Sequence, residues 1–269
     1  MSDRQPEQLT PAKPEPILQL KDIGKSFGGL IAIDSVDLCI QPGTIHGLIG
    51  PNGAGKSTLF NLICGITTPT RGEIHFEGLP VTLLAPHHRV RRGLARTFQN
   101  LQIFQDMTVL ENVMVGRHHL TRSTFIDALL NSSRQRQENS AGIQDGLQLL
   151  ERVGLAEKAQ QKAGALSYGE SKLLEIARAM ASKPSLLLLD EPLAGLPTQA
   201  IAHVEQAILD LHRDGTSIVL VEHNVGVVMR LANYISVLNN GRIISEGTPA
   251  HVAQDPAVLE AYLGGNIHA

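Results

Sequence analysis

The sequence predicts an α/β protein in which helices cross between the strands of a parallel sheet. Three apolar runs of strand length, at residues 186–189, 217–221 and 234–238, alternate with helical patterns in the second half of the chain. That alternation is typical of βαβ units, which build parallel sheets. The block between about residues 100 and 165 is helical and polar instead, so we expect it to be an insertion into the α/β core.

The first eighty residues supply further elements in order. Residues 17–20, 33–40 and 74–76 are short apolar segments with strand character. A further apolar run occupies residues 44–49, and residues 56–64 have the pattern of a helix. We therefore expect several strands and one helix before the helical block begins.

The polar segments and the lengths of the apolar runs indicate the cellular compartment in which the protein acts. Residues 1–16 are polar and proline-rich, which predicts a flexible leader and argues against a signal peptide. Residues 132–140, rich in Ser, Arg, Gln and Asn, are expected to be weakly structured. No apolar run approaches the roughly 20 residues that cross a bilayer. We expect a soluble, cytosolic protein whose membrane role must come through a partner.

The composition excludes several classes of function. Aromatic residues make up 3% of the chain against 42% for all apolar residues, so the core must be aliphatic. The net charge of −3 gives no global attraction to nucleic acid or anionic lipid, and we expect no nucleic-acid partner. Cys39 and Cys64 have no ligand spacing, and a lone pair provides no disulfide framework. A reducing compartment is therefore expected.

A glycine-rich segment between a predicted strand and a predicted helix matches the pattern G-x-x-x-x-G-K-[ST]. It consists of Gly50, Pro51, Asn52, Gly53, Ala54, Gly55, Lys56 and Ser57, and Thr58 follows it. Its backbone N–H groups and the helix N-terminus would form a nest for anionic oxygens. Lys56 can reach the β- and γ-phosphates, and Ser57 can offer its hydroxyl to Mg²⁺. A plain glycine-rich turn does not account for these flanks, so the segment predicts nucleoside triphosphate binding.

Two carboxylates follow the apolar run at residues 186–189. The four leucines alone would be core, but the acidic pair Asp190 and Glu191 is harder to explain, because an isolated buried carboxylate costs several kcal/mol. Asp190 suits the role of holding Mg²⁺, usually through water. Glu191 is placed to orient or deprotonate an attacking water.

Four further motifs occur along the chain. Together with the glycine-rich segment and the acidic pair, they resemble the motifs of the ABC ATPase family and follow the same order along the sequence. They are KSFGG at residues 25–29, RTFQN at 96–100, LSYGE at 166–170 and VEHN at 221–224. The resemblance spans residues 17–265. It implies a P-loop NTPase (RecA-like) core with an antiparallel β subdomain and an inserted α-helical subdomain at about residues 100–178.

The resemblance also implies roles for three residues that would mean little alone. Phe27 would stack on adenine, although in isolation it could be one more core aromatic. Gln99 would touch Mg²⁺ and link the core to the helical insertion, although a glutamine there could be a surface residue. His223 would contact the γ-phosphate and hold the surroundings of the catalytic water, although a histidine at a strand end is more often structural.

The LSYGE motif supports two interpretations that are compatible. Ser167 and Glu170 have the S-x-x-E spacing of a capping box before an apolar-periodic helix. A capped helix start with Gly169 at closest approach is also a γ-phosphate site, which the family offers to ATP held by the other subunit. Tyr168 and Glu170 replace the usual Gly and Gln of this signature, and Pro197 stands where most relatives carry Asp or Asn.

The finer pattern resembles the ATPase subunits of branched-chain (hydrophobic) amino acid importers. It rests on residues 27–29, 96–99, 107–109, 111–113, Tyr168, 261–265 and the polar insertion at 121–141. That resemblance implies an ATPase, using ATP and Mg²⁺, at the cytoplasmic face of the inner membrane. It implies integral membrane permease subunits as partners, a solute-binding protein indirectly, and either a homodimer or a heterodimer with a paralogous ATPase.

Other classes of protein share some of these features. Lipopolysaccharide-export ATPases share the region around His223 and the terminal Tyr-Leu-Gly, but not the Arg-Thr-Phe-Gln form. Non-transport ABC ATPases of translation or DNA repair usually carry two cassettes or a long coiled coil, whereas this chain has one phosphate loop and no sustained heptads. A P-loop kinase would leave the signature without a purpose, and a purely regulatory module would be expected to lack Glu191.

Overall fold

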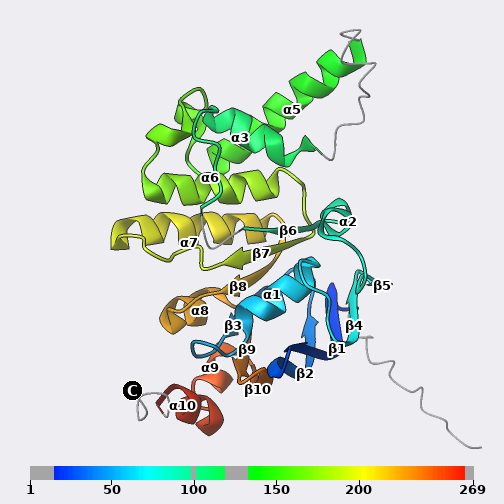
Figure 1. The fold of residues 1–269 in the computed structure, drawn as a ribbon. Helices are drawn as coiled ribbons and strands as arrows, with labels where there is room; N and C mark the ends of the chain where they lie inside the picture. The colour runs from blue at the N-terminus through cyan, green and yellow to red at the C-terminus, as the bar shows by residue number, and fades with distance from the viewer. Residues whose placement is uncertain (1–14, 98–100, 119–132, 264–269) are drawn as a thin grey trace, which may run out of the picture.

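The computed structural model describes residues 15–97, 101–118 and 133–263. These residues form two β-sheets, with helices packed between and around them (Figure 1). The smaller sheet has the strand order β2-β1-β4-β5, and its neighbouring strands are antiparallel. Its strands are β1 (Leu18–Phe27), β2 (Leu30–Ile40), β4 (Arg71–Phe76) and β5 (Leu79–Pro80).

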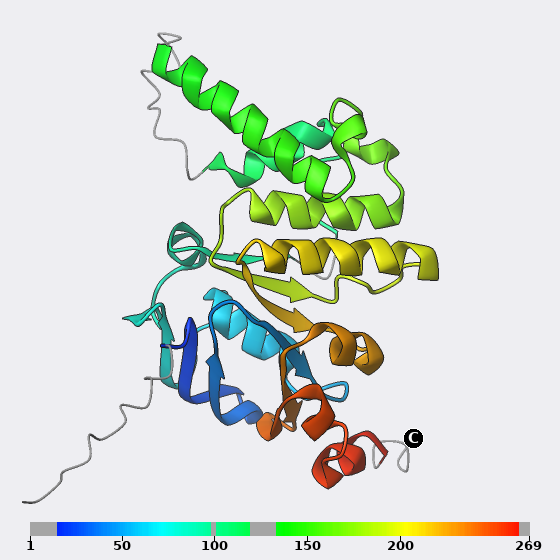
Figure 2. The ribbon, with the colours of Figure 1, turned by 180° about the vertical axis from the view of Figure 1, so that it is seen from behind.

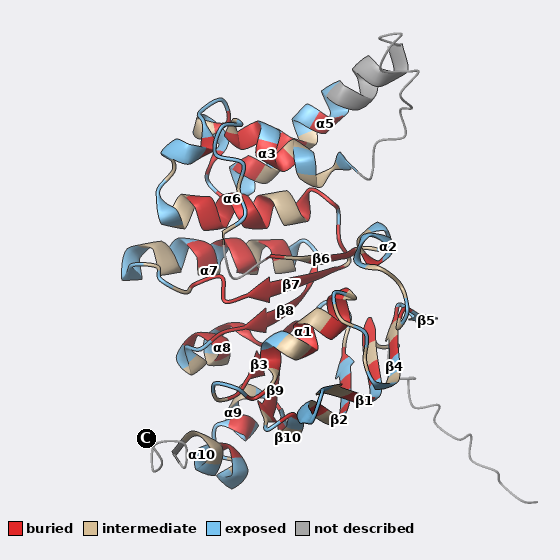
Figure 3. Ribbon diagram, viewed as in Figure 1, coloured by how far each residue is buried: buried red, intermediate tan, exposed pale blue. Residues whose placement is uncertain are grey.

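The larger sheet has the strand order β10-β9-β3-β8-β7-β6. Strands β9, β3, β8, β7 and β6 run parallel, and β10 pairs antiparallel with β9. Every residue of β3, β7 and β8 is buried, as expected for a parallel sheet covered on both faces (Figure 3). The strands are β3 (Ile45–Ile49), β6 (Leu94–Arg96), β7 (Leu186–Asp190), β8 (Ser217–Val221), β9 (Tyr234–Asn239) and β10 (Arg242–Gly247).

The larger sheet divides the core into two apolar clusters, because alternate residues of β7 and β8 belong to opposite clusters. On one side α1 (Lys56–Cys64) buries Leu59, Phe60 and Ile63 between the two sheets. On the other side α6 (Tyr168–Met180) and α7 (Thr198–Arg213) pack against each other near β7, and α3 (Val109–Gly116) lies beyond α6 (Figure 2). The remaining helices are α2 (Pro86–Arg91), α8 (Val225–Leu231), α9 (Pro249–Val252) and α10 (Pro256–Leu263), with short 3-10 turns at Ala156–Lys158 and Ala163–Ala165.

A stretch expected to be weakly structured belongs to a helix. Residues 132–140 were predicted to be weakly structured, but α5 (Ser133–Arg152) begins at Ser133. The stretch has no apolar periodicity of the kind that predicts an amphipathic helix. Its Arg, Gln and Glu residues nevertheless have high helix propensity, which favours a helix without an apolar stripe.

Several expectations fall on residues outside those described. They are the first fourteen residues of the leader, Gln99, most of the polar stretch at 121–141, and Gly264 and Gly265. No disulfide joins Cys39, which is exposed, to Cys64, which is buried. Among the described residues, no helix combines the length and the apolar character that crossing a membrane requires.

Candidate active site

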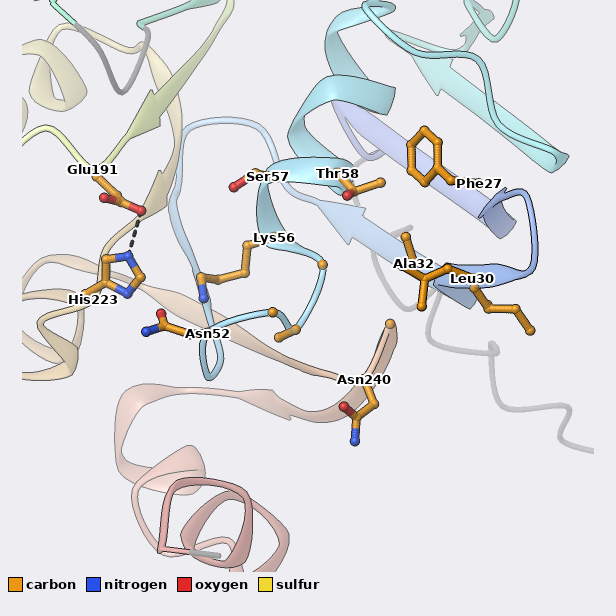
Figure 4. A pocket seen from close by; sticks show the side chains of 15 residues that line it. Phe27, Leu30, Ala32, Asn52, Lys56, Ser57, Thr58, Glu191, His223 and Asn240 are labelled. Atoms are coloured by element: carbon orange, nitrogen blue, oxygen red, sulfur yellow. Dashed lines mark ion pairs between the residues drawn. The ribbon is translucent and has the colours of Figure 1, made fainter. Parts of the chain in front are cut away.

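A cavity of about 620 Å³ opens where the two sheets meet the start of α1 (Figure 4). It gathers residues that are far apart in the sequence and that the motifs had singled out. Its lining residues are Phe27, Leu30, Ile31, Ala32, Asn52, Gly53, Ala54, Gly55, Lys56, Ser57, Thr58, Glu191, His223, Asn240 and Gly241. The cavity therefore combines most of the glycine-rich loop, Glu191 of the acidic pair and the predicted adenine-stacking aromatic in one place.

The glycine-rich loop links the end of β3 to the start of α1. Gly55 is the N-cap of α1 with φ at 107°, a conformation that disfavours any residue with a Cβ, and a Cβ there would lie 2.7 Å from the carbonyl oxygen of Ala32. As a glycine it caps no backbone N–H of α1 with a side chain, and the first residues of the helix, Lys56, Ser57 and Thr58, line the cavity. A helix start of this kind favours bound anions.

Lys56 is held inside this loop. Its Nζ donates hydrogen bonds to the carbonyl oxygens of Gly50 at 2.6 Å and Pro51 at 3.0 Å. Burial holds the pKa of Lys56 below its usual value, and the negative charges of Glu191 and Asp190 partly oppose that shift. The loop's own backbone therefore fixes the ammonium beside the helix start.

The two carboxylates diverge at the end of β7. Asp190 is the last residue of the strand and is 3% exposed, and its Oδ2 accepts a hydrogen bond from Arg96 at 2.7 Å. Glu191 is 7% exposed and has a positive φ of 51°, which turns the chain sharply after the strand. Its Oε1 lies 2.7 Å from Nε2 of His223 (Figure 4). The sharp turn thus directs Glu191 into the cavity while Asp190 stays in the sheet.

A third carboxylate lies behind these two. Glu222 is buried at the end of β8, and its Oε1 accepts the backbone N–H of Leu193 at 2.7 Å. Burial raises the pKa of Glu222, and the charge of Glu191 raises it further, while the N–H groups of Leu193 and His223 act in the opposite direction. Glu222 therefore ties the segment after β7 to the segment that follows β8 and contains His223.

The aromatic wall of the cavity is Phe27, at the end of β1. Its side chain is 51% exposed, and Nζ of Lys25 lies 4.9 Å from the centre of its ring. The alternative that Phe27 is a core aromatic is therefore wrong. The exposed ring is available to stack against a flat ligand beside Leu30 and Ile31.

The signature segment lies in a different cavity. Ser167 caps α6 in a capping box, because its Oγ accepts the N–H of Glu170 while Glu170 Oε2 accepts the N–H of Ser167 at 2.9 Å. This second cavity, of about 370 Å³, is lined by Ser167, Tyr168, Gly169, Glu170, Leu173, Pro197, Gln199, Ala200 and His203. It shares no lining residue with the cavity of the glycine-rich loop.

Comparisons with known proteins agree on the family to which this chain is related. Residues 33–194 match the family model described as "ABC transporter". The chain belongs to the ABC transporter family. Residues 242–268 match a second model of this family, described as "Branched-chain amino acid ATP-binding cassette transporter".

Individual relatives of this ABC ATPase span nearly its whole length. It is 39% identical over 256 residues to the high-affinity branched-chain amino acid transport ATP-binding protein LivG of Escherichia coli K12, covering 93% of this chain and 98% of the relative. It is 37% identical over 250 residues to BraF of Pseudomonas aeruginosa, with the same coverage. Its fold matches the ADP conformation of MJ1267, an ATP-binding cassette of an ABC transporter, with a TM-score of 0.80 and 32% identity over 93% of this chain and 99% of that one.

This ABC ATPase binds nucleotide and hydrolyses ATP in support of transport. Of the residues predicted for this site, the structure places Phe27, residues 52–58, Glu191 and His223 in the lining of the cavity, whereas Gly50, Pro51 and Asp190 are not among its lining residues. Two segments that line it were not singled out from the sequence: Leu30–Ala32 at the start of β2, and Asn240–Gly241 between β9 and β10. The Asn-Gly pair was a recognisable hairpin turn signal. Gln99 lies outside the described residues.

Proposed function

We propose that this ABC ATPase powers the import of branched-chain or other hydrophobic amino acids, acting at the cytoplasmic face of the inner membrane. The proposal is supported by the printed functions of its relatives LivG and BraF and by the match of its C-terminal residues to the branched-chain model. Permease subunits would form the membrane path, and a solute-binding protein would deliver the amino acid. No residue of the ATPase itself would touch the solute.

The single observation that carries the mechanism is the division of the motifs between two cavities. The phosphate-binding residues and Glu191 line one cavity, while Ser167 and Gly169 line another with no residue in common. A γ-phosphate held by Lys56 would therefore need a signature helix from a second chain. We infer that two subunits, either identical or paralogous, sandwich each ATP between the glycine-rich loop of one and the α6 start of the other.

Within this site each group has a role that its position supports. Phe27 would stack on adenine, the loop from Gly50 to Thr58 would bind the phosphates, and His223 would contact the γ-phosphate. Glu191 would orient or deprotonate the attacking water, since its carboxylate faces the same cavity as Lys56. The bond between Glu191 and His223 holds that carboxylate on the phosphate side.

The donors present also fit Mg²⁺. Ser57 offers a hydroxyl and Asp190 a carboxylate, and the described residues contain no cluster of three or more His, Cys, Asp or Glu that could hold a metal alone. Mg²⁺ usually takes one or two carboxylates together with substrate phosphates and waters, so such an incomplete set is appropriate. Bound there, with Gln99 as a further proposed ligand, Mg²⁺ would neutralise charge on the phosphate oxygens.

The chain would be organised around this site. We infer a leader at residues 1–16 and one ATPase domain at 17–265, into which a helical and signature subdomain is inserted at about residues 100–178. The packing of α3 and α5 against α6, beyond the sheet, supports a separate helical unit. Movement of that unit when the two subunits close would act on the permease.

The energy required for closure is moderate. Shifting the ratio of closed to open dimer from 1:99 to 99:1 needs about 5.5 kcal/mol of differential ATP binding to the two states. Hydrogen bonds to ionised groups contribute roughly 1.5–3 kcal/mol each, so a few contacts from Ser167 and the α6 N-terminus would suffice.

The dimer is tested with Glu191→Gln, which should bind ATP but hydrolyse it very slowly. Size-exclusion chromatography with ATP and Mg²⁺ should then show a stable dimer, whereas Glu157→Gln, at an exposed position away from the cavity, should behave as the unsubstituted protein does. If the Glu191→Gln protein remains a monomer at saturating ATP, the sandwich is wrong.

The cargo needs a separate experiment. The ATPase and the permease subunits encoded by its neighbouring genes would be reconstituted in vesicles. ATP hydrolysis would then be measured with a solute-binding protein that carries leucine, a charged amino acid, or no ligand. Stimulation by the leucine-loaded protein alone supports the proposed import. Equal rates under all three conditions contradict it.

A further inference from the structure

Arg96 connects three separate parts of the protein through one buried guanidinium. It is the last residue of β6, and its side chain is 10% exposed. One terminal nitrogen donates to Asp190 Oδ2 at 2.7 Å, and the other donates to Asn61 Oδ1 at 2.7 Å. The guanidinium carbon lies 5.6 Å from the ring centre of Phe60, so Arg96 also packs against α1.

These contacts restrict the Asp190 carboxylate. The backbone of Asp190 is fixed in β7, and its N–H donates to the hydroxyl of Thr97 at 3.3 Å. The carboxyl group can still rotate about its own side-chain bonds, and the bond from Arg96 fixes Oδ2. Since Asn61 holds the opposite side of the guanidinium, α1 and β7 are connected through two consecutive hydrogen bonds.

Asn61 stands four residues after Ser57 on α1. The network therefore begins on the helix that carries one proposed magnesium ligand and ends on the carboxylate of the other. Residues that hydrogen-bond to metal ligands orient those ligands, and their loss commonly costs 10- to 100-fold in metal affinity.

We propose that Arg96 is a positioning residue for the metal site: by donating to Oδ2 of Asp190 while it is bonded to Asn61 on α1, it leaves the other oxygen, Oδ1, to serve the metal. This inference rests on the proposed roles of Asp190 and Ser57. It differs from simple charge compensation, which any cation near Asp190 would provide. Arginine is needed because its planar fork reaches Asp190 and Asn61 at once, which a lysine ammonium on a flexible stem would not reproduce.

The experiment separates metal affinity from nucleotide affinity. Mn²⁺ binding is measured by electron paramagnetic resonance with ADP present, and trinitrophenyl-ATP binding is measured by fluorescence in EDTA. We expect Arg96→Lys to weaken Mn²⁺ binding by about 10- to 100-fold while metal-free nucleotide affinity stays within about twofold. Asn61→Ala, which leaves the Arg96 charge in place, should weaken Mn²⁺ binding in the same direction but less.

The matched control is Arg213→Lys, which changes an exposed arginine paired with Asp210 on the surface of α7. It should alter neither measurement. Mn²⁺ binding that is unchanged or tighter in Arg96→Lys overturns the proposal, since it would mean that Arg96 only neutralises Asp190 or competes with the metal. If Arg96→Lys does not fold, unchanged Mn²⁺ affinity in Asn61→Ala overturns it instead. Failure of the unsubstituted protein to bind trinitrophenyl-ATP would contradict the proposed function, not the role of Arg96.

Discussion

The two roles assigned to Ser167 can be separated by comparing it with a second capping box in the same chain. Thr108 caps α3 with the same chemistry, since its Oγ1 accepts the N–H of Glu111 at 3.1 Å and Glu111 Oε2 accepts the N–H of Thr108 at 2.7 Å. In the Ser167 box the corresponding distances to Glu170 are 3.4 and 2.9 Å. Ser167→Ala and Thr108→Ala thus remove equivalent caps, only one of which is proposed to meet ATP.

The stability cost of each change should be similar. Losing a capping side chain costs about 1 kcal/mol, and the longer bond of Ser167 predicts no greater loss than at Thr108. For a domain of this size the melting temperature should fall by roughly 2–4 °C in both variants. Scanning calorimetry of the nucleotide-free proteins provides this measurement.

The effect on hydrolysis should differ between the two variants. If Ser167 donates to the γ-phosphate across a dimer, its loss removes a hydrogen bond to an ionised group worth roughly 1.5–3 kcal/mol. Steady-state ATP turnover should then fall roughly 10- to 150-fold in Ser167→Ala, and less than twofold in Thr108→Ala. Nucleotide affinity of the isolated subunit should not change in either, because Ser167 lies outside the cavity of the glycine-rich loop. Equal turnover in the two variants would mean that Ser167 acts only as a helix cap.

Three further predictions follow from single side chains. Phe27→Ala should weaken ATP binding about 5- to 150-fold in a fluorescence titration, because stacking on a base is worth roughly 1–3 kcal/mol, and Phe27→Trp should retain it. Gly55→Ala should abolish nucleotide binding, since its φ is 107° and the added Cβ would lie 2.7 Å from Ala32 O; normal affinity would contradict the loop geometry. Burial lowers the pKa of His46 from 6.5 to about 4. As the pH falls, His46 is therefore protonated in the unfolded chain before it is protonated in the folded protein. The free energy of unfolding should consequently drop by about 3 kcal/mol between pH 6.5 and pH 4. Denaturant unfolding should show a smaller drop in His46→Asn; an equal drop would assign the pH dependence elsewhere.

Where a signal is local, the sequence predicted the structure to the residue. The helix expected at residues 56–64 is α1, and the capping box at Ser167 is present with both of its hydrogen bonds. Both depend on short-range chemistry, a glycine N-cap in one case and an S-x-x-E spacing in the other. Strands β7 and β8 were recognised because buried parallel strands are continuous apolar runs.

The parts that were missed depend on tertiary contacts or on very short elements. Strand β6 has three residues, too few for any periodicity, and it exists because Leu94–Arg96 pair with β7. The bond between Arg96 and Asp190 joins residues 94 positions apart, so no spacing rule could reveal it. Phe27 could not be assigned to core or surface from the sequence alone, because its exposure depends on where β1 ends relative to the cavity.

The charged groups of the nucleotide site are held in place by the protein's own hydrogen bonds, and this has an energetic consequence. A lysine ammonium has three donors, and Lys56 directs two of them to Gly50 and Pro51, which leaves the third for a phosphate without breaking either bond. Glu191 adopts a left-handed backbone that costs of order 1–3 kcal/mol, and its N–H bond to Val221 O at 2.9 Å helps to maintain it. Because the protein's own contacts maintain these positions, ATP binding would not have to reorganise the groups proposed to act on it. In the proposed dimer, the differential energy of ATP binding would then be available for closing the two subunits.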